Sequence, residues 1–255
     1  MNLLEIDDWF NRFLKKEYFQ HDPSRNGIQI ANSAPGSKEI KKVAFAVDAC
    51  EETALKAAEL KCDLLFVHHG LFWGDCTPVT GIHYRRIAAF IKNDLALCAY
   101  HIPLDANNPY GNNFGIASRL GLTRTRPFGE WRGMTLGAMG ELETPVTIEE
   151  LEKKLFPDGQ KANIILPFGK KMIKSVAIIS GGAGEDFEQA SECGADAFIT
   201  GEISHECYHP VKESGLNVIA GGHYATETVG VNLVRQKLEE ETGIKTVFID
   251  IPTRL

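Results

Sequence analysis

Residues 43–70 read VAFAVDACEETALKAAELKCDLLFVHHG and contain a complete strand–helix–strand unit. The apolar runs at 41–49 and 62–70 have the length and the β-branched composition of buried strands, and the stretch between them has helical spacing. The second run ends on two adjacent histidines, His68 and His69. Because such units form parallel strands joined by a crossover helix, the sequence predicts an α/β fold.

The same pattern returns in the second half of the chain. Val43 aligns with Val176 at an offset of 133 residues (176 − 43), and Asp63 then falls on Asp196 without a gap. A second match, at an offset of 121 (216 − 95), relates the stretch from Leu95 to that from Leu216. We interpret these matches as a pseudo-repeat, with the alternative that any two strand–helix–strand segments resemble each other.

The repeat suggests a domain organisation. We predict an N-terminal α/β lobe over 1–122, a connecting or interface segment over 123–172, and a C-terminal α/β lobe over 173–255 that completes the site. The middle segment contains a capping box, Thr147 to Glu150, which predicts a helix start. Equivalent strand ends of both lobes can serve one site, because ligands bind outside the carboxyl ends of parallel strands.

Composition excludes several classes of protein. The longest apolar runs fall far short of the roughly 20 residues of a membrane helix, and the N-terminus lacks the basic start of an export signal, so we expect a cytoplasmic protein. The net charge is −7 and the basic residues are scattered, which disfavours a nucleic-acid partner. None of the six cysteines forms a C-x-x-C pair, which argues against zinc ribbons and thioredoxin sites.

Side chains that can bind metal follow several of the predicted strands. Adjacent side chains on an extended chain point to opposite sides, so His68 and His69 suit two neighbouring ions better than one. His101 and Asp105 lie at the end of the predicted strand at 95–106, and a carboxylate can bridge two ions. Each position also has a structural explanation: a satisfied core histidine or a surface pair for the histidines, and a helix N-cap or turn for the aspartate.

The second half offers a comparable set. His223 and Glu227 are four residues apart, so they share one face of a helix that starts here. Glu202, His205 and His209 follow another predicted strand and are candidates for orienting ligands or contacting substrate. The alternatives are a capping pattern at the first pair and ordinary surface polarity at the others. The glycine-rich stretch 180–186 is interpreted as a tight turn, with anion contact as the alternative. Together, the strand ends of both halves favour a site for zinc, iron, manganese, cobalt or nickel.

Seven motifs occur in a characteristic order: NGIQI at 26–30, VHHGLFW at 67–73, HIPLDA at 101–106, GNN at 111–113, TGEIS at 200–204, GGHYATE at 221–227 and FIDIP at 248–252. In these motifs the chain resembles the YbgI-type dinuclear metal-centre proteins, also called GTP cyclohydrolase 1 type 2 homologues. The resemblance implies two α/β lobes facing each other across a cleft that holds two divalent ions, and a toroidal homohexamer. The metal ligands that it implies are His68, His69, Asp105, His223 and Glu227, with Asp105 and Glu227 as bridges.

A dinuclear centre of this kind predicts a metal-dependent hydrolase, in which a hydroxide that bridges the ions attacks a small-molecule substrate. His101, His205 and His209 are the candidate catalytic proton carriers, because imidazole titrates near neutrality. The family label implies ring opening of GTP, although the sequence has no base-recognition or triphosphate motif. The alternative is a non-catalytic, metal-loaded ring that acts as a scaffold or regulatory partner-binding protein, and a nucleic-acid binder is a third class.

Overall fold

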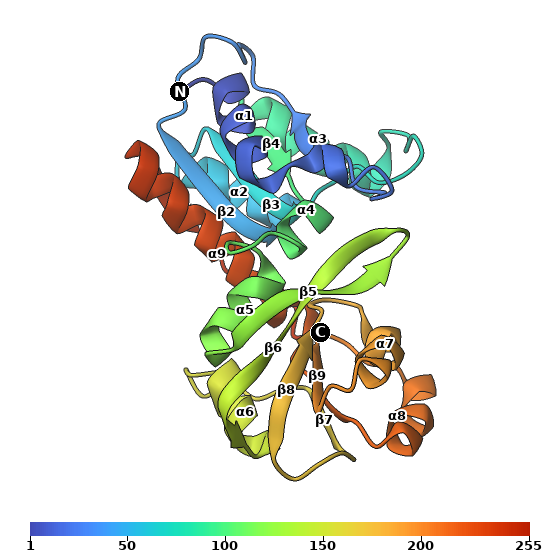
Figure 1. The fold of residues 1–255 in the computed structure, drawn as a ribbon. Coiled ribbons are helices and arrows are strands. Elements are labelled where there is room, and N and C mark those ends of the chain that lie inside the picture. Colours follow the sequence, from blue (N-terminus) through green and yellow to red (C-terminus); the bar gives the residue numbers. More distant parts are fainter. The chain divides into compact units, whose positions relative to one another are not determined.

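The computed structural model describes residues 1–255, which form two compact units (Figure 1). Unit 1 comprises residues 1–104 and 231–251, and unit 2 comprises 105–230 and 252–255. Each unit contains one mixed β-sheet with helices, which confirms the predicted α/β class. No helix is both long enough and apolar enough to cross a lipid bilayer.

The sheet of unit 1 has five strands, of which only the first is antiparallel to its neighbour. In spatial order they are β1 (Gly27–Ile30), β4 (Ala96–Ala99), β3 (Leu64–His69), β2 (Lys42–Asp48) and β11 (Lys245–Phe248). The helices are α1 (Leu3–Leu14), α2 (Glu51–Glu59), α3 (Gly81–Lys92) and the one-turn α4 (Ile102–Asp105), with a 3-10 turn η1 (Lys16–Tyr18). The parallel pairings bring the carboxyl ends of β2, β3 and β4 to one edge of the sheet.

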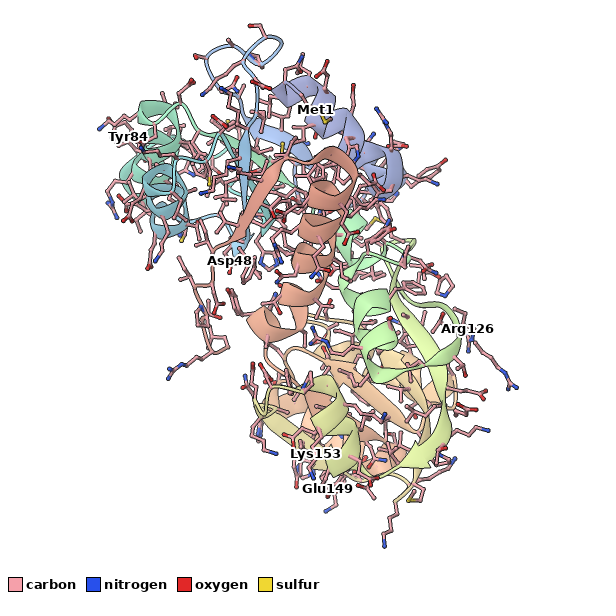
Figure 2. All side chains as sticks on the ribbon, turned by 90° about the vertical axis from the view of Figure 1, so that its left-hand side faces the viewer. Met1, Asp48, Tyr84, Arg126, Glu149 and Lys153 are labelled. Carbon is pink, nitrogen blue, oxygen red and sulfur yellow. The ribbon has the colours of Figure 1, made fainter.

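Both faces of this sheet are covered. On one face, Phe10 of α1 packs on Phe66 and Tyr100, with ring centroids 4.6 and 6.0 Å apart. On the other face, alanines of α2 and Phe90 of α3 join small and branched residues of the strands in a second cluster. Tyr84, on the outer side of α3, is exposed (Figure 2). Successive residues of a strand face opposite sides of the sheet. Because both sides are covered here, nearly every residue of these strands is apolar.

The sheet of unit 2 has six strands, and three neighbouring strands within it run parallel. In spatial order they are β5 (Thr123–Trp131), β6 (Met134–Val146), β8 (Ile173–Ile178), β9 (Ala197–Thr200), β10 (Asn217–Ala220) and β7 (Ile164–Pro167). The helical elements are α5 (Asn112–Leu120), α6 (Ile148–Leu155), η2 (Gly184–Asp186), α7 (Phe187–Glu192), η3 (His205–Cys207) and α8 (Tyr208–Ser214). Helix α9 (His223–Thr242) begins in unit 2 and ends in unit 1.

The unit boundaries differ from the predicted ones at 122 and 172. Residues 123–172 supply β5, β6, α6 and β7, so they are built into the second sheet. The capping box predicted at Thr147 is present, and α6 turns Glu149 and Lys153 to the surface (Figure 2). The reason for the difference is that strand pairing with β8 and β10 is a long-range contact, which local composition does not reveal.

Equivalent strands and one shared contact support the repeat. Both sheets contain three parallel strands in the same order, β4-β3-β2 and β10-β9-β8. The Asp63 carboxylate accepts backbone N–H bonds from residues 41 and 42, and the Asp196 carboxylate accepts them from residues 174 and 175. These partners keep the offset of 133 that relates the two aspartates. The predicted two-lobe pseudo-repeat is therefore confirmed at the level of fold.

We expect Asp196→Ala to lower the free energy of unfolding by about 2–3 kcal/mol, because two backbone N–H groups and Lys170 lose their acceptor. The Asp196 side chain is only 8% exposed, so water replaces it poorly. Urea unfolding measures the effect, with the exposed Glu213→Ala on α8 as control. Equal midpoints for the two variants would contradict the shared role of this aspartate.

Candidate metal centre

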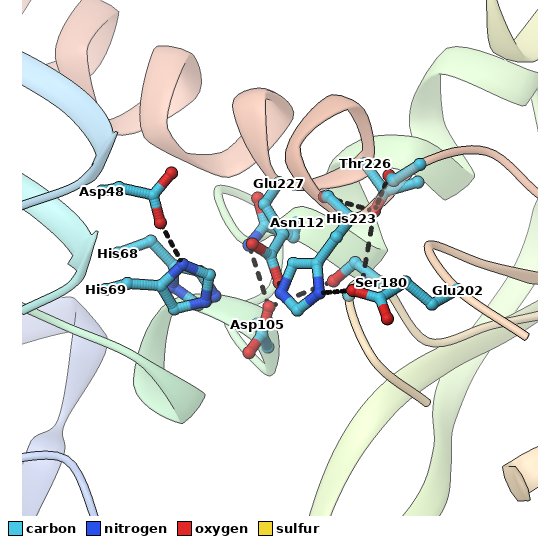
Figure 3. Close-up of polar contacts among 12 residues, drawn as sticks. Asp48, His68, His69, Asp105, Asn112, Ser180, Glu202, His223, Thr226 and Glu227 are labelled. Atoms are coloured by element: carbon cyan, nitrogen blue, oxygen red, sulfur yellow. Dashed lines mark hydrogen bonds and ion pairs between the residues drawn. The ribbon is translucent and has the colours of Figure 1, made fainter. Parts of the chain in front are cut away.

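Two histidines at the carboxyl end of β3 are held by neighbouring strands of unit 1. His68 is fully buried, and its Nδ1 lies 3.1 Å from the carbonyl oxygen of Tyr100. Asp48, the last residue of β2, pairs with His69 across the ladder and places Oδ1 2.8 Å from its Nδ1 (Figure 3). An acceptor at Nδ1 keeps the proton on that nitrogen, so Nε2 is the ring nitrogen that could bind a metal.

The two rings converge, contrary to the expectation that adjacent side chains diverge. The ring centroids of His68 and His69 are 4.4 Å apart, with an angle of 45° between the planes. The alternation of a pleated strand applies inside the strand, and His69 is the last residue of β3. The bond to Asp48 then determines where its ring points.

His101, predicted as a proton carrier, joins these two rings. Its centroid lies 5.1 Å from that of His68 and 5.7 Å from that of His69. Its Nδ1 is 2.9 Å from Oδ1 of Asp22, whose side chain is completely buried. Burial alone would raise the pKa of Asp22, but the hydrogen bond and charge of His101, with hydrogen bonds from Asn26 and the Ser24 N–H, lower it below its ordinary value. Unit 1 thus contains a cluster of three imidazoles, each with one ring nitrogen within 4.8 Å of the others.

Asp105 is the first residue of unit 2 that could bind a metal. Its Oδ1 accepts hydrogen bonds from Nδ2 of Asn112 at 2.8 Å and from Oγ of Ser180 at 3.1 Å (Figure 3). Asn112 is itself fixed, because its Oδ1 accepts the backbone N–H of Gly230. Two hydrogen bonds use both lone pairs of Oδ1, so Oδ2 is the oxygen of Asp105 that could bind a metal.

His223 and Glu227 share the first turn of α9, as their spacing predicts. His223 Nε2 is 3.1 Å from Oε1 of Glu227, and its Nδ1 is 2.5 Å from Oε1 of Glu202 (Figure 3). Burial alone would lower the pKa of His223, but the hydrogen bonds and charges of Glu227 and Glu202 raise it to about 9. A carboxylate oxygen of Asp105 lies within 4.8 Å of one of Glu227. Glu227 and Glu202 therefore lie beside the two ring nitrogens of His223.

The glycine-rich turn after β8 has a steric role. Gly181 has a φ of +68°, and a Cβ there would overlap Oε1 of Glu227 and lie 3.1 Å from Nε2 of His223. Its N–H donates to Oγ1 of Thr226 at 3.2 Å. The turn is thus adapted to a close approach of the donor residues, which fits the interpretation of 180–186 as a tight turn.

The other predicted proton carriers, His205 and His209, lie outside both donor groups. Both side chains are exposed, and neither belongs to a group of residues that could hold a metal. Their catalytic role stays a prediction. Glu202, from the same segment, contacts Nδ1 of His223 and can orient its ring, as predicted.

Sequence reasoning missed most of the residues that hold the donors in place. The sequence could have indicated Asp48, because it lies at the end of a predicted strand that neighbours the strand of His68 and His69. Nothing in the sequence indicates Asp22, because it is 79 residues from His101. Asn112 belongs to the GNN motif, but only the structure connects it to Asp105.

We expect metal affinity in unit 2 to rise about tenfold per pH unit between about pH 7 and 8.5, because an ion must displace the proton of His223. Zinc titration against a chelator at several pH values measures this, and calorimetry in two buffers counts the released proton. Glu202→Gln should flatten the profile, since it removes one of the two carboxylates that raise the pKa of His223. A pH-independent affinity of the unaltered protein over this range would contradict the expectation.

Comparisons with known proteins agree on one family. The model of the family Duf34/NIF3 (NGG1p interacting factor 3) matches residues 1–254. A protein of Treponema pallidum named GTP cyclohydrolase 1 type 2 homolog is 43% identical, over 99% of each chain. Two solved structures match the whole of both chains with TM-scores of 0.90: the protein ybgI, described as of unknown function, at 32% identity, and a Thermus thermophilus protein, TTHA1606, at 35%.

Proposed function

Because the chain belongs to the Duf34/NIF3 family, we propose that it is a dinuclear metal protein with hydrolase activity. The proposed ligands are His68, His69, Asp105, His223 and Glu227. The name of the Treponema pallidum relative supports a hydrolytic reaction and makes GTP the first substrate to test. The donor types, imidazole and carboxylate, suit zinc, iron, manganese, cobalt and nickel.

One observation carries the proposal. In four of the proposed ligands, one ring nitrogen or carboxylate oxygen has a hydrogen-bonding partner. Nδ1 of His68, His69 and His223 each lies beside an oxygen, and Oδ1 of Asp105 accepts two hydrogen bonds. Such partners fix the orientation of metal ligands and increase their basicity. Histidines that served packing alone would not require such a partner at each of the three rings.

The residues of the proposed site have different roles. When bound, a pair of divalent ions brings the pKa of a water to about 7 and stabilises negative charge on the attacking and leaving oxygens. Asp48 and Glu202 keep the rings of His69 and His223 oriented. Asn112 and Ser180 hold Asp105 so that it presents Oδ2.

An aromatic ring, that of Trp73, lies beside the imidazole of His101. The ring of Trp73 is 4.8 Å from that of His101, at an interplanar angle of 73°. Its Nε1 donates to the carbonyl of Gly70 at 2.8 Å, and Gln29 accepts the N–H of Leu71 at 2.7 Å, so the loop is held firmly. This half-buried ring supports the choice of purine nucleotides for the first assays.

The test is turnover that depends on metal. Protein stripped by a chelator under anaerobic conditions is reloaded with one metal at a time and assayed on GTP and a panel of cyclic amides and phosphate esters. We expect restored turnover in the unaltered protein and none in Glu227→Gln. The scaffold alternative predicts that metal restores thermal stability while no substrate is consumed.

We extend the proposal to assembly, because the resemblance implies a ring of six chains. Sedimentation velocity should then show one large species with the mass of six chains of 28.2 kDa. A monomer of the metal-loaded protein at micromolar concentration would exclude the ring.

A further inference from the structure

We propose that the tip of the β5–β6 hairpin binds a phosphate group of the substrate, through the guanidinium of Arg132 stacked on the ring of Trp131. This role rests on the proposed function, because it concerns the substrate of that reaction. All the contacts that support it lie within unit 2, and it assigns no metal ligand.

The hairpin projects past the carboxyl end of β8 (Figure 1). The ladder between β6 and β8 ends at Ala138, whereas β5 and β6 stay paired as far as Trp131. Residues 128–131 and 134–137 therefore form a two-stranded extension, which is about 14 Å long for four residues per strand. Strand β10, parallel to β9 and β8, leads at this same end into His223. Ligands bind outside this end of parallel strands.

The extension is held in place at both of its strands. On β5, Oε1 of Gln189 accepts the N–H of Glu130 at 2.8 Å, and its Nε2 donates to the carbonyl of Glu130 at 3.1 Å. On β6, Nδ2 of Asn113 donates to the carbonyl of Leu136 at 2.8 Å, and its Oδ1 accepts the N–H of Ser180 at 2.7 Å. Because a two-stranded ribbon alone is marginally stable in water, these bonds are what fixes the tip relative to the end of β8.

Arg132 has a backbone conformation that its side chain disfavours. It forms the turn with Gly133, and the φ angles of the two residues are +52° and +75°. The first position of such a turn is usually Asn, Asp or Gly. No ion pair or hydrogen bond of the Arg132 side chain within the protein offsets this strain. Local strain of this kind is concentrated at functional sites, so we infer that the side chain serves a ligand.

The stacked guanidinium is suited to a phosphate. Its Cζ lies 4.4 Å from the centroid of the Trp131 ring, and Arg132 is exposed. The stack leaves the N–H groups at the edge of the guanidinium available, and their planar fork matches two oxygens of one phosphate. It also restricts the side chain before binding, so less entropy is lost. A substrate with phosphate groups, such as GTP, would find at this tip the recognition that no sequence motif provides.

The test compares GTP with guanosine, which lacks the phosphates, on the metal-loaded full chain. Arg132→Gln should weaken GTP binding about 10–100-fold, as expected for loss of charge-assisted hydrogen bonds, and leave guanosine binding and metal content unchanged. Calorimetry measures both affinities. Arg124→Gln is the matched control, because Arg124 is also an exposed arginine of β5 with a φ of +51°, but it pairs with Glu141. We expect GTP binding of this control to equal that of the unaltered protein.

Arg132→Gly separates ligand binding from folding. Glycine adopts positive φ without strain, so the melting temperature should not fall, while GTP binding should fall as far as in Arg132→Gln. Unchanged GTP binding in both variants, or equal losses for GTP and guanosine, would overturn the inference. So would an unaltered protein that binds neither GTP nor inorganic triphosphate, or variants that lose only self-association.

The outcomes for the inference and for the proposed function are distinct. GTP that binds through Arg132 but is not consumed would contradict the proposed function alone. GTP that is consumed with the same KM by Arg132→Gln and by the unaltered protein would contradict the role of Arg132 alone.

Discussion

Gly181→Ala is expected to disrupt the metal centre although residue 181 donates no ligand. The added Cβ would overlap Oε1 of Glu227 and lie 3.1 Å from Nε2 of His223, so both donors must move. Displacement of two ligands should cost more than the ~100-fold in affinity that loss of one orienting partner can cost. Zinc or cobalt competition with a chelator measures the loss.

Gly194→Ala is the matched control, because it separates steric displacement from backbone strain. Gly194 has a φ of +72°, close to the +68° of Gly181, but nothing lies within 4 Å of its Cβ position. Each alanine costs about 1–2 kcal/mol for the left-handed backbone conformation. We expect the two variants to differ in metal affinity and not only in stability. Equal metal affinities would show that Glu227 does not approach this turn in the protein.

Glu227→Gln is expected to lower the metal content from about two ions per chain to one or fewer, with loss of the metal-restored turnover. Glu227 is 3% exposed, and a neutral amide there cannot compensate buried cations.

Glu240→Gln is the control for this substitution. It makes the same chemical change on the exposed side of the same helix, α9. Elemental analysis after anaerobic purification should give about two ions per chain for the control. A metal content of Glu227→Gln equal to that of the control would remove Glu227 from the site.

The parts of the fold that the sequence predicts well are those with local signals. The strands around 43–70 follow from apolar runs, and His223 and Glu227 meet because their spacing is one helical turn. The repeated aspartates, Asp63 and Asp196, align in the sequence and have the same contacts in both units.

The parts that the sequence does not predict depend on distant contacts. Residues 123–172 have an unremarkable composition, and only the ladder with β8 shows that they complete a sheet. The convergence of His68 and His69 depends on Asp48, which lies 21 residues before His69. The partnership of Asp22 with His101 brings together two loops that no periodicity connects.

The central proposal is that His68, His69, Asp105, His223 and Glu227 are the ligands of one pair of divalent ions. Anomalous diffraction from crystals of the metal-loaded protein tests it most directly. We predict two peaks about 3.5–4 Å apart, with His68, His69, Asp105, His223 and Glu227 as the protein ligands. Ions bound away from these residues would contradict the account.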